Sequence, residues 1–189
     1  MSNSVNEILI IGLGLIGASI AKASKEKGII VHGYDIKKSV IKTAIEDNVI
    51  DQSIDSIEGL NNKSLIDKID LVIISVSPKA TQEIINQIPN LMNTKITITD
   101  TSSVKNHLKI SSISNFILSH PIAGSDKSGI ASLDQTLFEN KKTIICNPNN
   151  VEDVHLKKLT DFWKYAMQMR VSEMSVKEHD LLFAMTSHL

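Results

Sequence analysis

The chain has 189 residues, of which 42% are hydrophobic and 22% charged, a balance typical of a folded globular protein. Its formal net charge of −1 argues against nucleic acid as the main partner, because phosphate binding requires a surplus of basic side chains. The single cysteine, Cys146, excludes a disulfide framework and is expected to be a small buried hydrophobe. The polar N-terminus and the lack of a long apolar run predict neither a signal peptide nor a membrane span, and we expect a cytoplasmic protein.

Short apolar runs alternate with amphipathic segments, which predicts an α/β fold with a doubly wound, mainly parallel sheet of the Rossmann type. Strands are expected over 7–11, 29–34, 70–76, 95–99, 115–118, 142–146 and 168–171. Helices are expected over 15–27, 37–47, 78–88, 103–110, 151–167 and 176–189.

The last of these helices has no stop signal. We therefore expect residues 1–172 to form a first domain and residues 173–189 to begin a helical second domain that is truncated here. The alternative is a natural C-terminal helix that packs on the first domain.

A glycine-rich turn lies between the first predicted strand and the first predicted helix. Gly12, Gly14 and Gly17 form a G-x-G-x-x-G pattern, which combines a tight turn, close backbone approach to a pyrophosphate, and close packing of helix on strand. The helix N-terminus at Leu15 and Ile16 then offers free N–H groups to phosphates. This context predicts a dinucleotide site, and the alternative is a doubly wound domain that binds no ligand.

An acidic residue, Asp35, ends the second predicted strand. Its carboxylate can accept hydrogen bonds from the adenosine ribose hydroxyls and would repel a 2′-phosphate, which favours NAD over NADP. Lys37 and Lys38 weaken this inference, because a lysine can serve a 2′-phosphate. Ligands of open α/β sheets lie beyond the carboxyl ends of the strands. Three residues at the carboxyl end of the strand expected over 70–76 and in its exit loop are therefore expected to line the cofactor's path: Ser75, Val76 and Ser77. The alternative is an ordinary structural loop.

Two polar segments that follow predicted strands are the candidates for chemistry. The first runs from Asp100 to Lys105, and the second runs from Ser119 to Asp126 and contains His120. We expect His120 to lie in a loop next to a proline, which is unusual for a core histidine, although a structural loop histidine is the alternative. Ser103 has an alternative role as the N-cap of the helix expected after it.

The remaining histidines do not form a metal site in the sequence pattern. His179 and His188 are nine residues apart, so they do not share a helical face as metal ligands four residues apart would. We expect no metal. Three histidines without sequence partners are expected to be structural or solvated: His32, His107 and His155.

The order of these motifs resembles that of the prephenate dehydrogenase family, which includes arogenate and cyclohexadienyl dehydrogenases. The resemblance covers essentially the whole chain. It rests on the glycine pattern at 12–17, Asp-x-x-Ser-Val-Lys at 100–105, Ser-His-Pro-Ile-Ala-Gly at 119–124, and Glu-His-Asp and Ser-His-Leu at 178–180 and 187–189. It implies NAD-dependent oxidative decarboxylation of prephenate or arogenate by hydride transfer, in tyrosine biosynthesis.

The resemblance also implies roles for single residues. His120 would contact the substrate hydroxyl and accept its proton, a role that suits a neutral imidazole with an ordinary pKa of about 6.5. Ser103 would orient His120 and approach the nicotinamide, with Ser102 as an adjacent competitor for this role. Asp126 would lie near the pocket entrance and contribute to substrate binding.

Family members continue past the position of Leu189 with a second functional histidine and a helical domain that completes the substrate pocket and forms a homodimer. Prephenate is a dicarboxylate, and proteins favour arginine for binding carboxylates. The single arginine of this chain, Arg170, is nevertheless expected to be structural. We therefore expect NAD binding with little or no turnover by this chain alone. One alternative is an NAD-binding fragment or regulatory module without catalysis, and another is a different hydroxyacid oxidoreductase, which would use a lysine base on a later helix.

Overall fold

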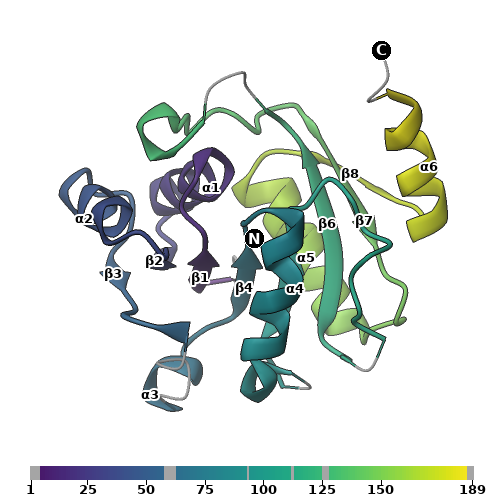
Figure 1. Ribbon diagram of the computed structural model, residues 1–189, viewed down its shortest axis with the longest axis horizontal. Helices are drawn as coiled ribbons and strands as arrows, with labels where there is room; N and C mark the ends of the chain where they lie inside the picture. Colours follow the sequence, from purple (N-terminus) through teal and green to yellow (C-terminus); the bar gives the residue numbers. More distant parts are fainter. Residues whose placement is uncertain (1–4, 58–62, 93, 112, 125–127, 187–189) are drawn as a thin grey trace.

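The computed structural model describes residues 5–57, 63–92, 94–111, 113–124 and 128–186 (Figure 1). An eight-stranded sheet runs through it in the order β3-β2-β1-β4-β5-β6-β7-β8. Neighbouring strands are parallel except for β6 and β7, which confirms the predicted mainly parallel α/β fold. The strands are β1 Glu7–Ile11, β2 Ile30–Tyr34, β3 Gln52–Ser53, β4 Leu71–Ile74, β5 Thr97–Asp100, β6 Phe116–Ile122, β7 Lys142–Cys146 and β8 Arg170–Glu173.

Helices cover both faces of the sheet (Figure 1). The α-helices are α1 Leu15–Glu26, α2 Lys38–Glu46, α3 Lys63–Ile66, α4 Pro78–Gln87, α5 Asp153–Asp161 and α6 Val176–Thr186, with 3-10 turns η2 Pro89–Leu91 and η3 Ile130–Ser132 and a π-helical turn η4 Phe162–Ala166. Side chains of β1 alternate between the two resulting cores: Ile8 and Ile10 pack with α1, α2 and α5, whereas Leu9 and Ile11 pack with α3 and α4. A strand buried on both faces needs apolar residues at every position, which explains the continuous apolar runs.

Helix α6 begins with a capping box and lies at the β7–β8 end of the sheet (Figure 1). Ser175 Oγ accepts a hydrogen bond from the Glu178 amide at 3.2 Å, and Glu178 Oε2 accepts one from the Ser175 amide at 2.9 Å. Val176 and Phe183 of α6 pack against the same core as β4 and β5. Strand β8 ends at Glu173, one residue beyond the expected limit of the first domain, and the division at 172 stays a prediction.

The helix expected over 103–110 is absent, and that prediction is wrong. The segment is irregular, with a turn at Asn106 and His107, and the Lys105 side chain is buried against Asp100 instead of lying on a helix surface. A buried ion pair therefore overrides the local helix propensity of this segment. Strand β3 and helix α3 are short elements that the sequence pattern did not predict.

The loop expected at His120 is also a wrong prediction, because β6 continues through Ile122. Pairing of β6 with β5 covers Phe116 and Ile117, whereas pairing with β7 extends to Ile122. The second half of β6 therefore has a neighbouring strand on one side only, within the described part of the chain. Proline is tolerated at such an edge, and this explains how Pro121 lies within a strand.

Among the described residues, no helix is long and apolar enough to cross a membrane.

Candidate functional site

The turn after β1 forms the glycine-rich cradle that the sequence predicts. Gly12 has a φ of +97°, and a Cβ atom there would lie 2.4 Å from the Ser75 carbonyl oxygen. A Cβ atom on Gly17 would lie 1.9 Å from the Gly12 carbonyl oxygen, so the fold itself requires these two glycines. A Cβ atom on Gly14 would have no neighbour within 4 Å. The backbone at Gly14 is therefore open to a ligand, and no side chain caps the N-terminus of α1.

Asp35 closes the other side of this turn. Its Oδ2 accepts a hydrogen bond from the Leu13 amide at 2.9 Å, and its Oδ1 accepts one from the Lys37 amide at 2.9 Å. Each carboxylate oxygen can accept a further hydrogen bond, so these contacts leave acceptor capacity for a ligand hydroxyl. Ile36, which follows, is 85% exposed and adds an apolar surface that the sequence reading did not single out.

A cavity of about 450 Å³ opens at the carboxyl edge of the sheet. It lies where the chain leaves β1 and β4 in opposite directions, the switch point at which open α/β sheets bind ligands. Seven predicted site residues line it together: Gly14, Leu15, Ile16, Ser75, Val76, Ser103 and His120.

The other predicted residues lie outside this lining. Gly12 and Gly17 shape the turn beneath it, and Asp35 directly follows β2. The Ser77 hydroxyl accepts a hydrogen bond from the Ala80 amide at 3.4 Å and caps α4. Asp126 lies outside the residues that the structure describes.

The two adjacent serines have different surroundings. Ser102 is buried, and its hydroxyl lies 3.1 Å from the Thr81 hydroxyl on α4. Ser103 is exposed, and both serines line the cavity. Because no helix follows Ser103, its alternative role as an N-cap is wrong. The role of Ser103 toward His120 stays a prediction.

A buried network fixes the residue that precedes His120. The Ser119 amide donates to Asp100 Oδ1 at 3.2 Å, and the Ser119 carbonyl oxygen accepts from Lys105 Nζ. The Ser119 hydroxyl accepts from Trp163 Nε1 at 3.1 Å. Since both backbone groups and the side chain of Ser119 are held, the next residue has a defined position. Sequence reasoning missed Trp163, which lies 44 positions away from Ser119.

The His120 ring makes contacts with helix α6. Its Nδ1 lies 2.9 Å from His179 Nε2, and His179 Nδ1 lies 2.7 Å from Asp180 Oδ1. The Phe183 ring packs edge-on against His120 with 4.5 Å between centroids. Sequence reasoning assigned no role to His179 and Asp180, although both belong to the Glu-His-Asp motif at 178–180. A separation of 59 residues hides the contact between the two histidines from any local pattern.

Burial lowers the pKa of His120 to about 4. The positive charge of Lys105 and the neighbouring His179 contribute to this low value, whereas Asp180 opposes them. The imidazole is therefore neutral at neutral pH and can accept a proton or a hydrogen bond from a hydroxyl group in the cavity.

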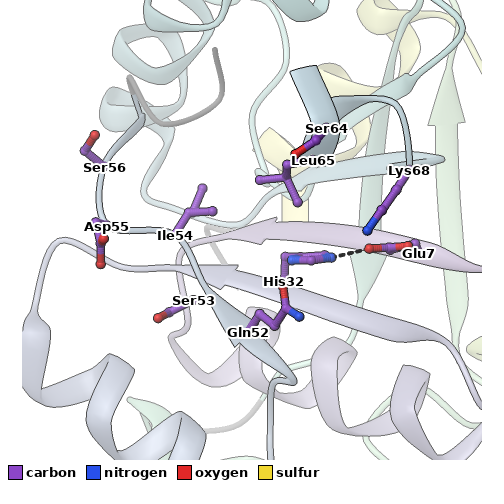
Figure 2. Close-up of a pocket in the computed structure, with 10 residues that line it drawn as sticks. All are labelled: Glu7, His32, Gln52, Ser53, Ile54, Asp55, Ser56, Ser64, Leu65 and Lys68. Atoms are coloured by element: carbon purple, nitrogen blue, oxygen red, sulfur yellow. Dashed lines mark hydrogen bonds and ion pairs between the residues drawn. The ribbon is translucent and has the colours of Figure 1, made fainter. Parts of the chain in front are cut away.

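The three histidines without sequence partners have structural contacts. His155 Nδ1 lies 2.9 Å from the Thr97 hydroxyl, and His107 Nε2 lies 2.9 Å from the Pro78 carbonyl oxygen. His32 is buried and pairs with Glu7 at 2.5 Å. Figure 2 shows this pair among the residues that line a second cavity, together with residues 52–56, 64, 65 and 68. This cavity has a volume of about 560 Å³, and His120 is not among its lining residues.

The remaining sequence expectations concern Cys146, Arg170, His188 and a metal site. Cys146 is buried within β7, as expected. Arg170 donates to the Asn140 carbonyl oxygen at 3.3 Å, a contact that links β8 to the loop before β7. His188 lies outside the described residues. Within the part of the chain that is described, no group of three or more histidine, cysteine or acidic residues could hold a metal ion.

Comparison with known proteins relates this arrangement to one family. Residues 20–171 match the family described as "Prephenate dehydrogenase, nucleotide-binding domain". Prephenate dehydrogenase of Lactococcus lactis subsp. cremoris is 32% identical over 196 residues, which cover 97% of this chain and 51% of the relative. Prephenate dehydrogenase of Bacillus subtilis is 31% identical over 100% of this chain and 52% of the relative.

A solved structure leads to the same family. Prephenate dehydrogenase from A. aeolicus, in complex with hydroxyphenyl propionate and NAD+, superimposes with a TM-score of 0.89 at 31% sequence identity. The match covers 100% of this chain and 66% of that structure. This chain thus spans about half the length of the two bacterial relatives named above. Since the matched family region covers most of the chain, this protein belongs to the prephenate dehydrogenase family.

Proposed function

We propose that this chain binds NAD and supplies the proton acceptor for hydride transfer in the oxidative decarboxylation of prephenate or arogenate, a step of tyrosine biosynthesis. The observation that carries the proposal is the position of His120. A neutral imidazole lines the same cavity as the open backbone at Gly14 and the N-terminus of α1. A proton acceptor and a dinucleotide cradle in one cavity are what a hydroxyl oxidation requires.

The residues of the cradle fit a dinucleotide. The uncapped amides at the start of α1 suit a pyrophosphate, and the Asp35 carboxylate suits the ribose hydroxyls. Ser75, Val76 and Ser103 would line the nicotinamide side. When bound, NAD supplies the acceptor for the hydride.

His120 would accept the proton of the substrate's ring hydroxyl as that carbon is oxidised. The ring carboxylate then leaves as carbon dioxide, its bonding electrons enter the ring, and the ring becomes aromatic. A pKa of about 4 makes the free imidazole a weak base. The carboxylates of a bound substrate would raise that pKa, because nearby negative charge favours the protonated ring. We also propose that Asp126 contributes to substrate binding, and that the whole protein is a homodimer.

Two other functions remain distinct from this proposal. A cofactor-binding module would bind NAD and would not respond to substrate. A hydroxyacid oxidoreductase with a lysine base would need a lysine at the cavity, and among the described residues that line it there is none. The buried Lys105 is instead paired with Asp100.

The test is to incubate the purified 189-residue chain with NAD and prephenate and to follow the absorbance of NADH, with arogenate and NADP in parallel. The matched variant is His120→Asn, and NAD binding is measured separately by calorimetry. NADH formation that disappears in His120→Asn supports the proposal. NAD binding without turnover favours a cofactor-binding module, and a chain that does not bind NAD contradicts both functions.

A further inference from the structure

We propose that His179 and Asp180 are positioning residues that hold His120 in the tautomer protonated on Nδ1, so that its unprotonated Nε2 is left for the substrate. Only the purpose of this arrangement rests on the proposed function. The arrangement itself is a property of the folded chain and can be measured without cofactor or substrate.

The Asp180 carboxylate determines which nitrogen of His179 carries a proton. Although burial raises the pKa of Asp180, hydrogen bonds from His179 and from the amides of Asn106 and Lys105 together hold it below its ordinary value. The two amides donate to the carboxylate at 2.8 Å and 3.1 Å. An ionised carboxylate can only accept hydrogen bonds. His179 must therefore carry a proton on Nδ1, the nitrogen 2.7 Å from Asp180 Oδ1.

The protonation of His179 in turn determines which nitrogen of His120 carries a proton. In a neutral His179 whose Nδ1 is protonated, Nε2 has no proton and can only accept. His120 Nδ1 lies 2.9 Å from that nitrogen and, with His179 in this neutral form, donates to it. The neutral His120 ring then has its lone pair on Nε2. Among the described residues, none makes a hydrogen bond to this Nε2 atom.

Packing around the two imidazole rings restricts their rotation. His179 is fully buried, and the Phe183 ring lies 4.5 Å from the His120 ring and 4.7 Å from the His179 ring, measured between centroids. The capping box of Ser175 and Glu178 fixes the start of α6 immediately before His179. Neither imidazole can rotate freely in these surroundings, so the order of the protons is maintained.

Two charged groups, Lys105 and Asp180, affect the protonation of His120. Lys105, the buried partner of Asp100, carries a positive charge that disfavours a second proton on His120. Asp180 is the acidic group on α6 whose charge acts on the ring. Burial and the charge of Lys105 favour one neutral ring with a single proton, and the opposing charge of Asp180 is the weaker effect. The hydrogen bonds that start at the carboxylate decide which nitrogen carries that proton.

The experiment is nitrogen NMR of the full chain with labelled histidine, which distinguishes a protonated from an unprotonated ring nitrogen. The His120 signals are assigned by their loss in His120→Asn. We expect His120 to be protonated on Nδ1 at neutral pH in the wild type. A wild-type His120 protonated on Nε2 would overturn the proposal.

Asp180→Asn provides the sharpest variant because it removes one charge and keeps the shape. The amide oxygen of the new side chain can still accept from the two backbone amides, while its NH₂ group can donate to His179 Nδ1. The hydrogen bond between position 180 and His179 then changes direction, and so does the one between His179 and His120. We therefore expect His120 to become protonated on Nε2. Asp161→Asn, which removes the partner of the exposed Lys157 on α5, is the control and should leave the tautomer unchanged. An unchanged His120 tautomer in Asp180→Asn would contradict the proposal.

Two variants of His179 test the other partner. His179→Gln places an amide oxygen where Nε2 was, so His120 should stay protonated on Nδ1. His179→Leu removes the acceptor, and His120 should shift toward the Nε2-protonated form. His155→Leu removes a different buried histidine and is the matched control. Equal tautomer populations in the Gln and Leu variants would count against the proposal.

Where the chain turns over prephenate, kinetics give a second readout. Asp180→Asn should lower kcat by about 100-fold or more with little change in KM, because misplacing the proton removes acid–base catalysis while leaving binding intact. His179→Gln should recover most of the rate. Absence of turnover by the isolated chain would bear on the proposed function alone, because the NMR result decides the tautomer separately.

Discussion

Lys105 Nζ lies 2.7 Å from Asp100 Oδ2, and neither side chain is exposed to solvent. Asp100 ends β5, and the same lysine donates to the Ser119 carbonyl oxygen in β6. The Asp100 carboxylate also accepts from the amides of Ser102 and Ser119. The pair therefore joins two strands and the segment that carries Ser103.

Replacing the lysine should destabilise the fold. Lys105→Met leaves a buried carboxylate without its counter-charge, and removal of one partner of a buried pair costs about 3–5 kcal/mol of unfolding free energy. Urea unfolding of the purified chain measures this change. Lys157→Met removes an exposed partner of Asp161 and should have no measurable effect. Equal unfolding midpoints for both variants would show that the buried pair does not stabilise the protein.

The low pKa of His120 predicts how stability depends on pH. Between the ordinary value of 6.5 and the folded value of about 4, the unfolded state binds a proton that the folded state does not. Stability from this residue is present above pH 6.5 and is lost as the pH falls toward 4, by about 2 kcal/mol after allowance for partial solvent exposure. Urea unfolding of wild type and His120→Asn across this range should show the difference. Parallel curves for the two proteins would rule out the depressed pKa.

Two glycine variants separate folding from cofactor binding. Gly17→Ala introduces a methyl group 1.9 Å from the Gly12 carbonyl oxygen and should strongly lower the midpoint of thermal unfolding. Gly14→Ala places its methyl group in open space, so the fold should persist while NAD affinity falls about tenfold or more. Calorimetry and thermal unfolding measure the two effects. Unchanged NAD affinity in Gly14→Ala would place the pyrophosphate elsewhere.

Asp35 should set the preference for NAD over NADP. Asp35→Asn keeps an acceptor oxygen for the Leu13 amide but removes the charge that repels a 2′-phosphate. The ratio of the Kd for NADP to the Kd for NAD should fall about tenfold, which corresponds to about 1.4 kcal/mol. Binding titrations with both dinucleotides measure this ratio, with Asp55→Asn as a control outside the cradle. A constant ratio would mean that Lys37 or Lys38, rather than Asp35, decides the preference.

Cys146 should be unreactive in the folded protein. Burial raises the pKa of its thiol to about 11, so almost no thiolate is present at neutral pH. A chromogenic thiol reagent should react slowly with the native chain and rapidly in urea. Fast reaction of the native protein at neutral pH would show that β7 opens far more readily than its buried position indicates.

The sequence predicted those parts of the fold that depend on local pattern. The strands Glu7–Ile11 and Lys142–Cys146 occur where their apolar runs place them, and Pro78 begins α4 as expected. The glycine turn was predictable because Gly12 and Gly17 are required by close contacts within the fold, whereas Gly14 leaves the backbone open to a ligand. A residue such as Asp35 could be placed because it follows a strand of clear pattern.

The remaining features depend on contacts between distant residues. Lys105 leaves its predicted helix because Asp100 and Ser119 form a buried site for its ammonium group. His120 lies in a strand because β7 pairs with it in antiparallel register, and this register has no local signature. His179 meets His120 only after the chain has crossed two further strands and helix α5.

The glycine-rich cradle and the contacts of His120 are formed by segments from opposite ends of the chain. The turn and helix that shape the dinucleotide cradle belong to the first βαβ unit, whereas α6, joined to β8 through Met174 and Ser175, supplies the partner of His120. A displacement of α6 would alter the proton on His120 and leave the cradle unchanged. Cofactor affinity and reactivity in this protein can therefore change independently of each other.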